Sequence, residues 1–239
     1  DENNNWISPD ELISKDGKKY LKNDKSKKVK VGPSESMSKS KKNTIDPEDI
    51  INNYGADSVR LFILSDSPPE KDIQWSQDGI IASFKFIQKL WSLNEKVLGE
   101  INKNHTKDNS DELTRFTNKF IKKISHNLEN FNYNIIIANL HEMHSYLSKE
   151  VIKGYQKKTI LENYKKILIT IMPILPHLSN ECIESIKIEN DELRWPTYDE
   201  KQIKENLINI VIQINGKKRG LINTKLDLEE VELFKLVKK

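Results

Sequence analysis

The chain lacks the features that mark several large classes of protein. Cys182 is the only cysteine among 239 residues, which excludes an internal disulfide and a zinc site built from several cysteines. The longest apolar stretch, 167–175, is interrupted by Thr170 and Pro173 and falls well short of the roughly 20 residues of a spanning helix. The first residues are acidic and polar, unlike a signal peptide. We therefore expect a cytoplasmic protein with no membrane partner, and Cys182 as a small core residue.

Positive charge is unevenly distributed along the chain. The segment from Lys15 to Lys42 holds eleven lysines against three acidic residues, Asp16, Asp24 and Glu35, which gives a net charge of +8. Because the whole chain carries +3, the remainder carries −5. Such a concentration attracts the phosphates of a nucleotide or of RNA. A solvated lysine-rich loop would have the same composition, so only a specific motif can decide between the two interpretations.

The hydrophobic pattern predicts a mainly α fold. Asp46 as N-cap followed by Pro47 predicts a helix start, and Gly55 separates this helix from a second one that ends at Ser67-Pro68-Pro69. From Gly79 the apolar spacing becomes helical, and five stripes predict an antiparallel helical bundle. These stripes are Ile80, Phe84, Ile87 and Trp91; Leu113, Phe116, Phe120, Ile124, Leu128 and Phe131; Ile136, Leu140, Met143, Leu147 and Val151; Ile160, Tyr164, Ile167 and Ile171; and Leu178, Cys182 and Ile186.

Short strands are predicted near both ends of the chain. The first 32 residues are polar, with turn signals at Ser8-Pro9-Asp10, Asp16-Gly17 and Gly32-Pro33, and with short strands at Tyr20-Leu21 and Val29-Lys30-Val31. They are typical of the edge of a larger fold. Near the other end, 209–214, the turn Asn215-Gly216 and 218–223 predict a hairpin, with a helix from about Leu228. Because two strands and a helix make too small a core to stand alone, we expect a truncated α/β domain.

A motif lies inside the lysine-rich segment. Its sequence is Ser36-Met37-Ser38-Lys39-Ser40-Lys41-Lys42-Asn43, and it leads directly into the helix start at Asp46. Ammonium and hydroxyl donors ahead of a helix N-terminus suit a triphosphate. The motif resembles the Lys-Met-Ser-Lys-Ser signature of class I aminoacyl-tRNA synthetases, a loop that closes on ATP during aminoacyl-adenylate formation. Ser36 departs from that signature, which has a Lys there, and one phosphate contact is therefore in question.

The resemblance extends along nearly the whole chain. The stretches Asp46-Pro47-Glu48-Asp49-Ile50-Ile51 and Tyr54-Gly55-Ala56-Asp57-Ser58-Val59-Arg60-Leu61-Phe62 are similar to the segment after this signature in the Leu, Ile and Val enzymes. Three further stretches resemble the leucyl enzyme in particular. They are Ser67-Pro68-Pro69-Glu70-Lys71-Asp72 with Trp75, Trp195-Pro196 with Asp199, and Val211-Ile212-Gln213-Ile214-Asn215-Gly216-Lys217-Lys218-Arg219. By resemblance the chain is the C-terminal portion of a bacterial-type leucyl-tRNA synthetase.

This resemblance implies four regions and one reaction. Residues 1–45 would be the end of a class I catalytic domain, 46–78 linking helices, 79–200 a tRNA-binding bundle of the anticodon-binding type, and 205–239 the truncated C-terminal α/β domain. Leucine and ATP, with Mg²⁺ in the complete enzyme, would give leucyl-adenylate and pyrophosphate, and tRNA-Leu would then accept the leucyl group. Because no His-Ile-Gly-His-like motif, leucine pocket or editing domain is found in the sequence, we expect the chain alone to be catalytically incomplete.

The resemblance also assigns roles to individual residues. Lys39 would be the catalytic cation, because it would neutralise charge developing on the phosphates. The ATP-binding set would be Ser38, Lys39, Ser40, Lys41 and Lys42. The two serines either donate to phosphate or favour the loop conformation. Lys217, Lys218 and Arg219 on the hairpin would meet the tRNA backbone, unless they form a generic basic turn.

Four other side chains invite a functional interpretation. Trp75 and Trp91 are expected to pack in the core or between domains rather than to stack on bases. His141 and His144 lie one helical turn apart, but no third ligand is evident and the spacing is not that of a zincin helix. We therefore expect no protein-bound metal in this chain.

Two other functions fit part of the pattern. The isoleucyl and valyl enzymes share the loop and the bundle, but the end of this chain has neither a cysteine zinc cluster of the isoleucyl type nor a long coiled coil of the valyl type. A non-catalytic tRNA-binding protein derived from a synthetase would account for Ser36 and for the missing upstream motifs. An intact catalytic loop would have little reason to persist in such a protein.

Overall fold

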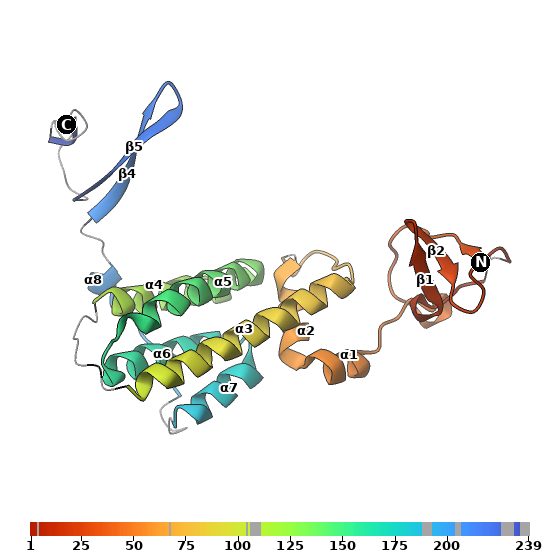
Figure 1. Ribbon diagram of the computed structural model, residues 1–239, viewed down its shortest axis with the longest axis horizontal. Helices are drawn as coiled ribbons and strands as arrows, with labels where there is room; N and C mark the ends of the chain where they lie inside the picture. Colours follow the sequence, from red (N-terminus) through yellow and green to blue (C-terminus); the bar gives the residue numbers. More distant parts are fainter. Residues whose placement is uncertain are drawn as a thin grey trace. The chain divides into compact units, whose positions relative to one another are not determined.

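The computed structural model describes residues 1–3, 5–66, 68–103, 105, 111–187, 193–203, 207–225 and 232–234. The chain forms two compact units, Asp1–Leu90 and Trp91–Lys239. The described residues are mainly helical, which confirms the predicted fold class (Figure 1). The helix predicted from about Leu228 begins outside the described residues. No described helix combines the length and the apolar composition that crossing a membrane requires.

The first unit begins with a short 3-10 helix, Pro9–Glu11, and a small antiparallel sheet. Its strands are β1 (Leu12–Lys15), β2 (Lys18–Leu21) and β3 (Lys28–Val29), in the order β1-β2-β3. Asp16 and Gly17 link β1 to β2 with φ values of 50° and 72°, a conformation that suits a two-residue hairpin turn. The predicted strand at Tyr20-Leu21 lies in β2. The strand predicted at 29–31 ends at Val29, and β1 was not predicted.

The register of this sheet places lysines opposite each other. Lys15 pairs with Lys18 and Tyr20 pairs with Lys28 across the strands. Like charges directly opposite each other destabilise a strand pair. Successive side chains of a strand alternate between the two faces of the sheet. Lys19 pairs with Val29, so it lies on the same face as Leu21 and the buried Val29. Ile13 and Tyr20 lie on the face of Lys15 and Lys18. Each face therefore carries both lysines and apolar side chains.

Two short helices follow the sheet, as predicted. In α1 (Pro47–Tyr54) the Asp46 carboxylate accepts a hydrogen bond of 2.9 Å from the Glu48 N–H, which satisfies a free donor of the first turn. Gly55, at φ 80°, ends α1. The second helix, α2 (Ala56–Asp66), buries Leu61 and Phe62.

The long helix α3 (Gln77–Ile101) corrects one of the predicted stripes. Of the four predicted residues only Ile80 is buried, whereas Trp91 leaves 37% of its surface exposed. The buried side chains are Ile80, Ser83, Phe86, Leu90, Leu93, Asn94, Val97, Glu100 and Ile101. Apolar residues surround much of α3, so several stripes of helical period fit the sequence equally well. The place in the core stripe predicted for Trp91 is wrong, because its neighbours Leu90 and Leu93 take the buried face. Packing between domains, the other role predicted for Trp91, stays a prediction.

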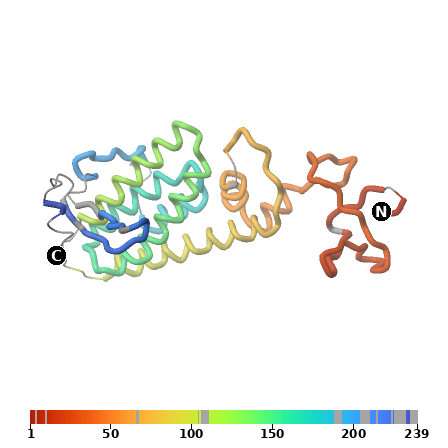
Figure 2. Tube along the Cα trace, turned by 90° about the horizontal axis from the view of Figure 1, so that it is seen from above, coloured from red at the N-terminus to blue at the C-terminus, as the bar shows by residue number. Residues whose placement is uncertain are grey.

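The second unit contains the rest of the helical bundle. Its helices are α4 (Asp111–Glu129), α5 (Tyr133–Glu150), α6 (Lys157–Ile171) and α7 (Pro176–Ser185), with a 3-10 turn, Val151–Lys153, after α5. Helix α4 packs against both α5 and α6, and α6 packs against α7 (Figure 2). The α5 stripe from Ile136 to Val151 and the α6 stripe from Ile160 to Ile171 are buried, as predicted.

One buried polar cluster ties three of these helices together. Asn94 on α3 has no exposed surface. Its amide donates to the Ser185 hydroxyl at 3.1 Å, and its carbonyl oxygen accepts from the Tyr164 hydroxyl at 3.2 Å. Nearby, Cys182 is 1% exposed, which confirms its predicted place in the core, and burial raises the pKa of its thiol to about 12.

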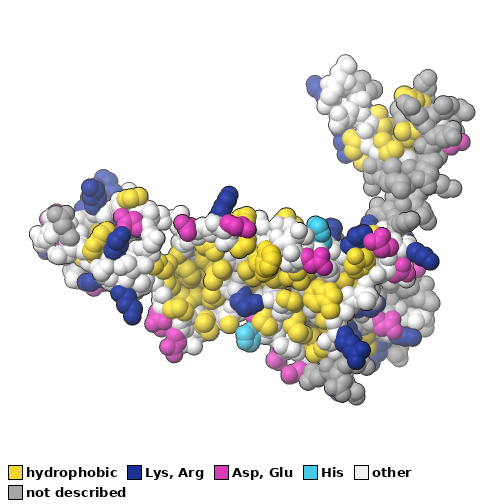
Figure 3. All heavy atoms as spheres, turned by 180° about the vertical axis from the view of Figure 1, so that it is seen from behind, with side chains coloured by type: hydrophobic (Ala, Val, Ile, Leu, Met, Phe, Trp, Pro, Cys, Tyr) yellow, Lys and Arg dark blue, Asp and Glu magenta, His cyan; other side chains and the backbone are white. Residues whose placement is uncertain are grey.

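The segment after the bundle folds back on α4. The Trp195 indole N–H donates to the Ser125 hydroxyl at 3.1 Å, and the Asp199 N–H donates to the side-chain oxygen of Asn118 at 2.8 Å. Lys122 pairs with Glu200 of the short helix α8 (Glu200–Ile203) at 2.7 Å. Figure 3 shows basic and acidic side chains mixed along the helices on the face that is drawn.

The predicted hairpin is present and longer than expected. It consists of β4 (Leu207–Ile214) and β5 (Lys217–Lys225). Asn215 and Gly216 form the turn with φ values of 53° and 73°, the positive values that an Asn-Gly hairpin turn requires. Gln213 pairs with Lys218 and Ile212 pairs with Gly220. Arg219 is therefore the additional residue of a β-bulge.

The end of α4 holds an unfavourable backbone conformation that a substitution can relieve. Phe131 lies at φ 55° and its side chain is 60% exposed, and the Asn132 N–H donates to the Asn127 carbonyl at 2.9 Å to close the helix end. Glycine adopts this conformation without steric cost. We expect the Phe131→Gly variant to have a free energy of unfolding about 1 kcal/mol higher than that of the Phe131→Ala variant. Urea denaturation measures both values. Both variants lose the aromatic ring, so equal stabilities would contradict a left-handed Phe131.

Candidate nucleotide-binding site

All the predicted ATP-binding residues lie in one folded loop, residues 36–43, which we call the lysine-serine loop. It leads from β3 toward α1 and contains a single 3-10 turn, Lys39–Lys41. The Lys41 N–H donates to the Ser38 carbonyl and the Lys42 N–H to the Lys39 carbonyl, both at 3.1 Å. Lys42 then adopts a left-handed conformation, φ 50°. The loop therefore doubles back before α1 begins.

The lysines of this loop differ in what surrounds them. Lys39 and Lys42 are exposed, and neither side chain has a hydrogen-bonding or ionic partner among the described residues. Lys41 pairs with the Glu35 carboxylate, and its ammonium lies 5.9 Å from the centre of the Trp6 ring. Lys39 and Lys42 are thus free to bind an anion, whereas Lys41 is already paired with the Glu35 carboxylate.

The two serines of the predicted set contact each other. The Ser38 and Ser40 hydroxyls lie 2.7 Å apart. One hydroxyl must donate and the other accept, so one hydroxyl proton remains available for a phosphate oxygen. Both proposed roles, shaping the loop and donating to phosphate, are compatible with this geometry.

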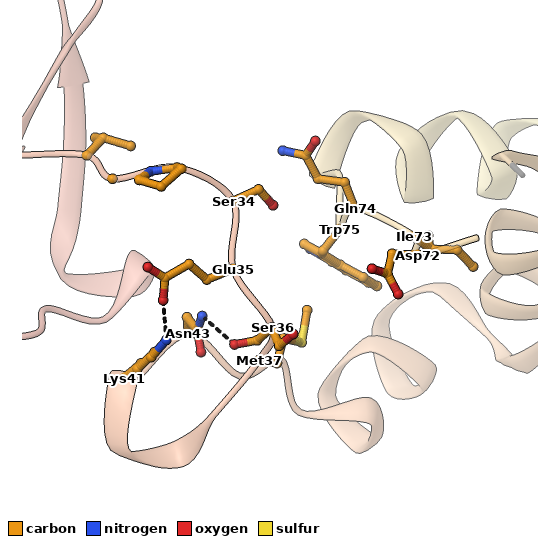
Figure 4. Close-up of a pocket in the computed structure, with 13 residues that line it drawn as sticks. Ser34, Glu35, Ser36, Met37, Lys41, Asn43, Asp72, Ile73, Gln74 and Trp75 are labelled. Carbon is orange, nitrogen blue, oxygen red and sulfur yellow. Dashed lines mark hydrogen bonds and ion pairs between the residues drawn. The ribbon is translucent and has the colours of Figure 1, made fainter. Parts of the chain in front are cut away.

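Sequence reasoning missed Asn43, which holds the loop from within. Its side-chain oxygen accepts from the Ser38 N–H at 2.7 Å. Its amide nitrogen donates to the Ser36 carbonyl at 3.3 Å, the bond drawn in Figure 4. An amide side chain carries both a donor and an acceptor. The only signal in the sequence was an Asn at the end of the motif, where Asn also suits any turn.

A cavity opens beside the loop. Its volume is about 1030 Å³, and it is lined by Val31–Met37, Lys41 and Asn43 from one side and by residues 72–75 from the other (Figure 4). Cavities of roughly this size hold small molecules in many proteins. Of the predicted ATP-binding set, only Lys41 lines it. Lys41 and Asn43 also line a second cavity of about 490 Å³ next to Trp6.

Trp75 forms part of the cavity wall and is fixed by packing. Its ring meets the Phe62 ring edge-on, with centroids 5.2 Å apart. The Phe62 ring in turn lies against Gly79, where an added Cβ would come within 2.5 Å of it. The packing role predicted for Trp75 agrees with this arrangement.

The predicted RNA contacts lie on another element, in the second unit. Lys217, Lys218 and Arg219 are all exposed at the start of β5. The bulge at Arg219 interrupts the alternation of the strand, and bulges commonly redirect a side chain. Three consecutive cations are therefore presented to solvent next to the turn.

Neither histidine of the helical pair belongs to a metal cluster. In α5 the His144 ring nitrogen lies 3.5 Å from the Ser148 hydroxyl. Among the described residues, no three His, Cys, Asp or Glu side chains are grouped closely enough to hold a metal ion.

Each of the two units matches a known protein family over part of its length. Residues 29–76 match the model of the class I tRNA synthetases for I, L, M and V, and residues 110–234 match the anticodon-binding domain of tRNA ligase. The chain therefore belongs to the class I tRNA synthetases and carries their anticodon-binding domain.

Within that family the relatives are leucine–tRNA ligases, which confirms the leucyl resemblance. The chain is 36% identical over 254 residues to the ligase of Wolbachia pipientis subsp. Culex pipiens, a match that covers 99% of this chain and 28% of the relative. It is 40% identical over 235 residues to that of Orientia tsutsugamushi, covering 96% and 27%. The chain thus spans little more than a quarter of the length of these relatives.

A solved structure shares the fold. It is the LeuRS of Agrobacterium radiobacter K84 in a ternary complex with tRNA and LeuAMS, and it superimposes with a TM-score of 0.71 at 22% identity. The match covers 84% of this chain and 27% of that chain. This likeness supports the arrangement of the helices.

The support of Trp75 can be tested with two glycines of one helix. Gly79→Ala places a Cβ against the buried Phe62 ring, so we expect it to lower the free energy of unfolding by roughly 1–3 kcal/mol and to alter Trp75 in the near-ultraviolet circular dichroism spectrum. Gly99→Ala is the matched control, because its Cβ would meet nothing within 4 Å. It should raise stability by up to about 1 kcal/mol. Equal effects of the two substitutions would show that Phe62 does not pack on Gly79.

Proposed function

We propose that this chain acts as part of a leucine–tRNA ligase that works in the cytoplasm. Its substrates would be leucine, ATP and tRNA-Leu. The observation that carries the proposal is the lysine-serine loop, which presents an unpaired Lys39 on a 3-10 turn ahead of α1. Similarity to leucine–tRNA ligases along 99% of the chain supports the choice of amino acid.

The loop would act in the first half-reaction. A carboxylate oxygen of leucine attacks the α-phosphorus of ATP, the bond between that phosphorus and the α,β-bridging oxygen breaks, and leucyl-adenylate and pyrophosphate result. Negative charge grows on the leaving phosphates during this step. The ammonium of Lys39 would stabilise that charge, and such preorganised stabilisation is usually a large part of catalysis.

The other members of the predicted set would bind ATP. Ser38 and Ser40 offer hydroxyls and Lys42 a free ammonium. Lys41 starts from its pair with Glu35, so its contact with phosphate exchanges one anion for another. That exchange would bring less net binding than a contact made by a free lysine, because the pair with Glu35 is lost.

Magnesium would accompany ATP. The donors of the loop are ammonium groups, hydroxyls and an amide, which fit phosphate oxygens, whereas Mg²⁺ prefers carboxylates, waters and phosphates. The residues of this chain would therefore contact the nucleotide, and the ion would neutralise phosphate charge without a ligand from the loop.

The RNA would be bound by the second unit. We retain the division into the catalytic end, 1–45, the linking helices, 46–78, the tRNA-binding bundle, 79–200, and the C-terminal domain, 205–239. The name of the anticodon-binding domain does not require that the anticodon be read. Exposed cations at Lys217, Lys218 and Arg219 support contacts to the RNA backbone.

The catalytic role of Lys39 can be tested in a complete ligase, made by replacing the matching segment of the Wolbachia relative with this chain. Lys39→Ala should slow adenylate formation by roughly 10²–10³ while leaving leucine affinity nearly unchanged, because the contact strengthens in the transition state. ATP–pyrophosphate exchange measures the rate.

Two variants of the same loop are the controls. Lys42→Ala removes an equally exposed charge, and Ser36→Lys restores the lysine of the family signature. Lys42→Ala should weaken ATP binding several-fold with little loss of rate at saturating ATP, because Lys42 would contact the phosphates alike in the ground and transition states. Ser36→Lys should change activity several-fold at most, because one more exposed charge on the loop is screened. If Ser36→Lys raised activity as much as Lys39→Ala lowered it, the loop would be degenerate, and a non-catalytic RNA-binding protein would become the better proposal.

The hairpin can be tested by salt dependence. We expect the chain to bind tRNA weakly, and the variant with Lys217, Lys218 and Arg219 changed to Ala should lower the slope of log affinity against log salt by roughly 2 if all three meet phosphates. Fluorescence anisotropy of labelled tRNA at several salt concentrations measures this slope. Changing Lys217 and Lys218 to Arg and Arg219 to Lys keeps the charge of the hairpin and should leave the slope nearly unchanged. Equal slopes for both triple variants would show that the hairpin does not contact RNA.

A further inference from the structure

We propose that Asn43 is a positioning residue that holds the lysine-serine loop in the shape that presents Lys39 to ATP. The inference rests on the ATP role proposed for the loop. Asn43 itself carries no charge and is not among the predicted ATP-binding residues. It would act through the backbone that it bridges.

The bridge joins both ends of the loop. The Asn43 oxygen accepts from the N–H of Ser38, which is the N-cap of the 3-10 turn, and the Asn43 amide donates to the carbonyl of Ser36. Ser36 and Ser38 lie on one edge of the loop and are separated only by Met37. Two hydrogen bonds to that edge fix both its position and its direction, whereas one would leave it free to rotate.

The other contacts of the loop do not supply this restraint. The bond between Ser38 and Ser40 joins two side chains, and the pair of Lys41 with Glu35 holds a side chain that can rotate about its own bonds. The left-handed Lys42 turns the chain back, so that Asn43 comes level with Ser36 and Ser38. The backbone on either side of Lys39 is thus held by the turn itself and by Asn43.

The consequence for binding follows from the orientation of Lys39. A free lysine populates many rotamers, so a mobile backbone beneath it would add further states that do not meet the phosphates. Loss of the Asn43 bridge leaves the charge of the loop unchanged and lowers the fraction of productive loops. Affinity for the triphosphate should fall while its salt dependence stays the same.

The test uses this chain with Asn43→Ala, and magnesium ATP as the probe. NMR gives the exchange rate of the Ser38 amide proton and the ATP affinity from shifts of the loop amides. A hydrogen bond of ordinary strength predicts about 3- to 10-fold faster exchange and about 3- to 10-fold weaker binding. Asn43→Asp retains the oxygen that accepts from Ser38, so its Ser38 exchange should stay slow.

Asn53→Ala is the matched control. Asn53 is another Asn of the first unit whose amide donates to a backbone carbonyl, that of Asp49 at 2.8 Å, but it lies in α1, outside the loop. It should change neither the exchange of Ser38 nor the affinity for ATP. A merely structural role of Asn43 would lower the free energy of unfolding without a selective loss of ATP binding.

The outcomes separate the two proposals. Absence of ATP binding by the unmodified chain would overturn the ATP role of the loop, and this inference with it. ATP binding that Asn43→Ala leaves unchanged would overturn the positioning role alone. Unchanged exchange of Ser38 in Asn43→Ala would show that the bridge is not formed, and would also overturn it.

Discussion

The second unit depends on one buried amide group, that of Asn94. A fully buried amide that lost its partners would cost roughly 1–3 kcal/mol, and its two partners lie on different helices, Tyr164 on α6 and Ser185 near the end of α7. Sliding α7 by one turn would preserve many apolar contacts, because Leu and Ile pack in several registers, but it would break this cluster. The amide therefore selects a single register among packings that the hydrophobic effect alone would leave nearly equal.

Local chemistry explains why so many helix ends and turns could be predicted. Asp46 with Pro47, and Asn215 with Gly216, act through their own backbone and need no distant partner. The buried face of α3 could not be predicted in this way, since apolar residues lie around the helix and only the packing of its neighbours chooses among them. Strand β1 was missed for a similar reason, because Leu12–Lys15 becomes a strand only by pairing with β2.

The same contrast holds at the candidate site. The motif predicted which segment would meet a triphosphate, because its lysines and serines are consecutive. The resemblance singled out Lys39 as the catalytic cation but placed Lys41 and Lys42 alike in the ATP-binding set. The structure distinguishes these two: Lys41 pairs with Glu35 and has the Trp6 ring beside it, and Trp6 lies far away in the sequence. Asn43 was overlooked because its importance comes from the direction of its side chain, which the left-handed Lys42 determines.

Because two lysines face each other in the N-terminal sheet, added salt should favour the pairing of its strands while it weakens the binding of RNA. Lys15 and Lys18 are cross-strand partners, so their repulsion opposes the pairing of β1 with β2. Added salt shortens the range of that repulsion to about 10 Å at 0.1 M and about 3 Å at 1 M. The sheet should therefore become firmer in the buffers in which RNA is released. A bound polyanion would neutralise the same charges, so the sheet would be most ordered either in concentrated salt or against phosphate, and least ordered in dilute buffer without a ligand.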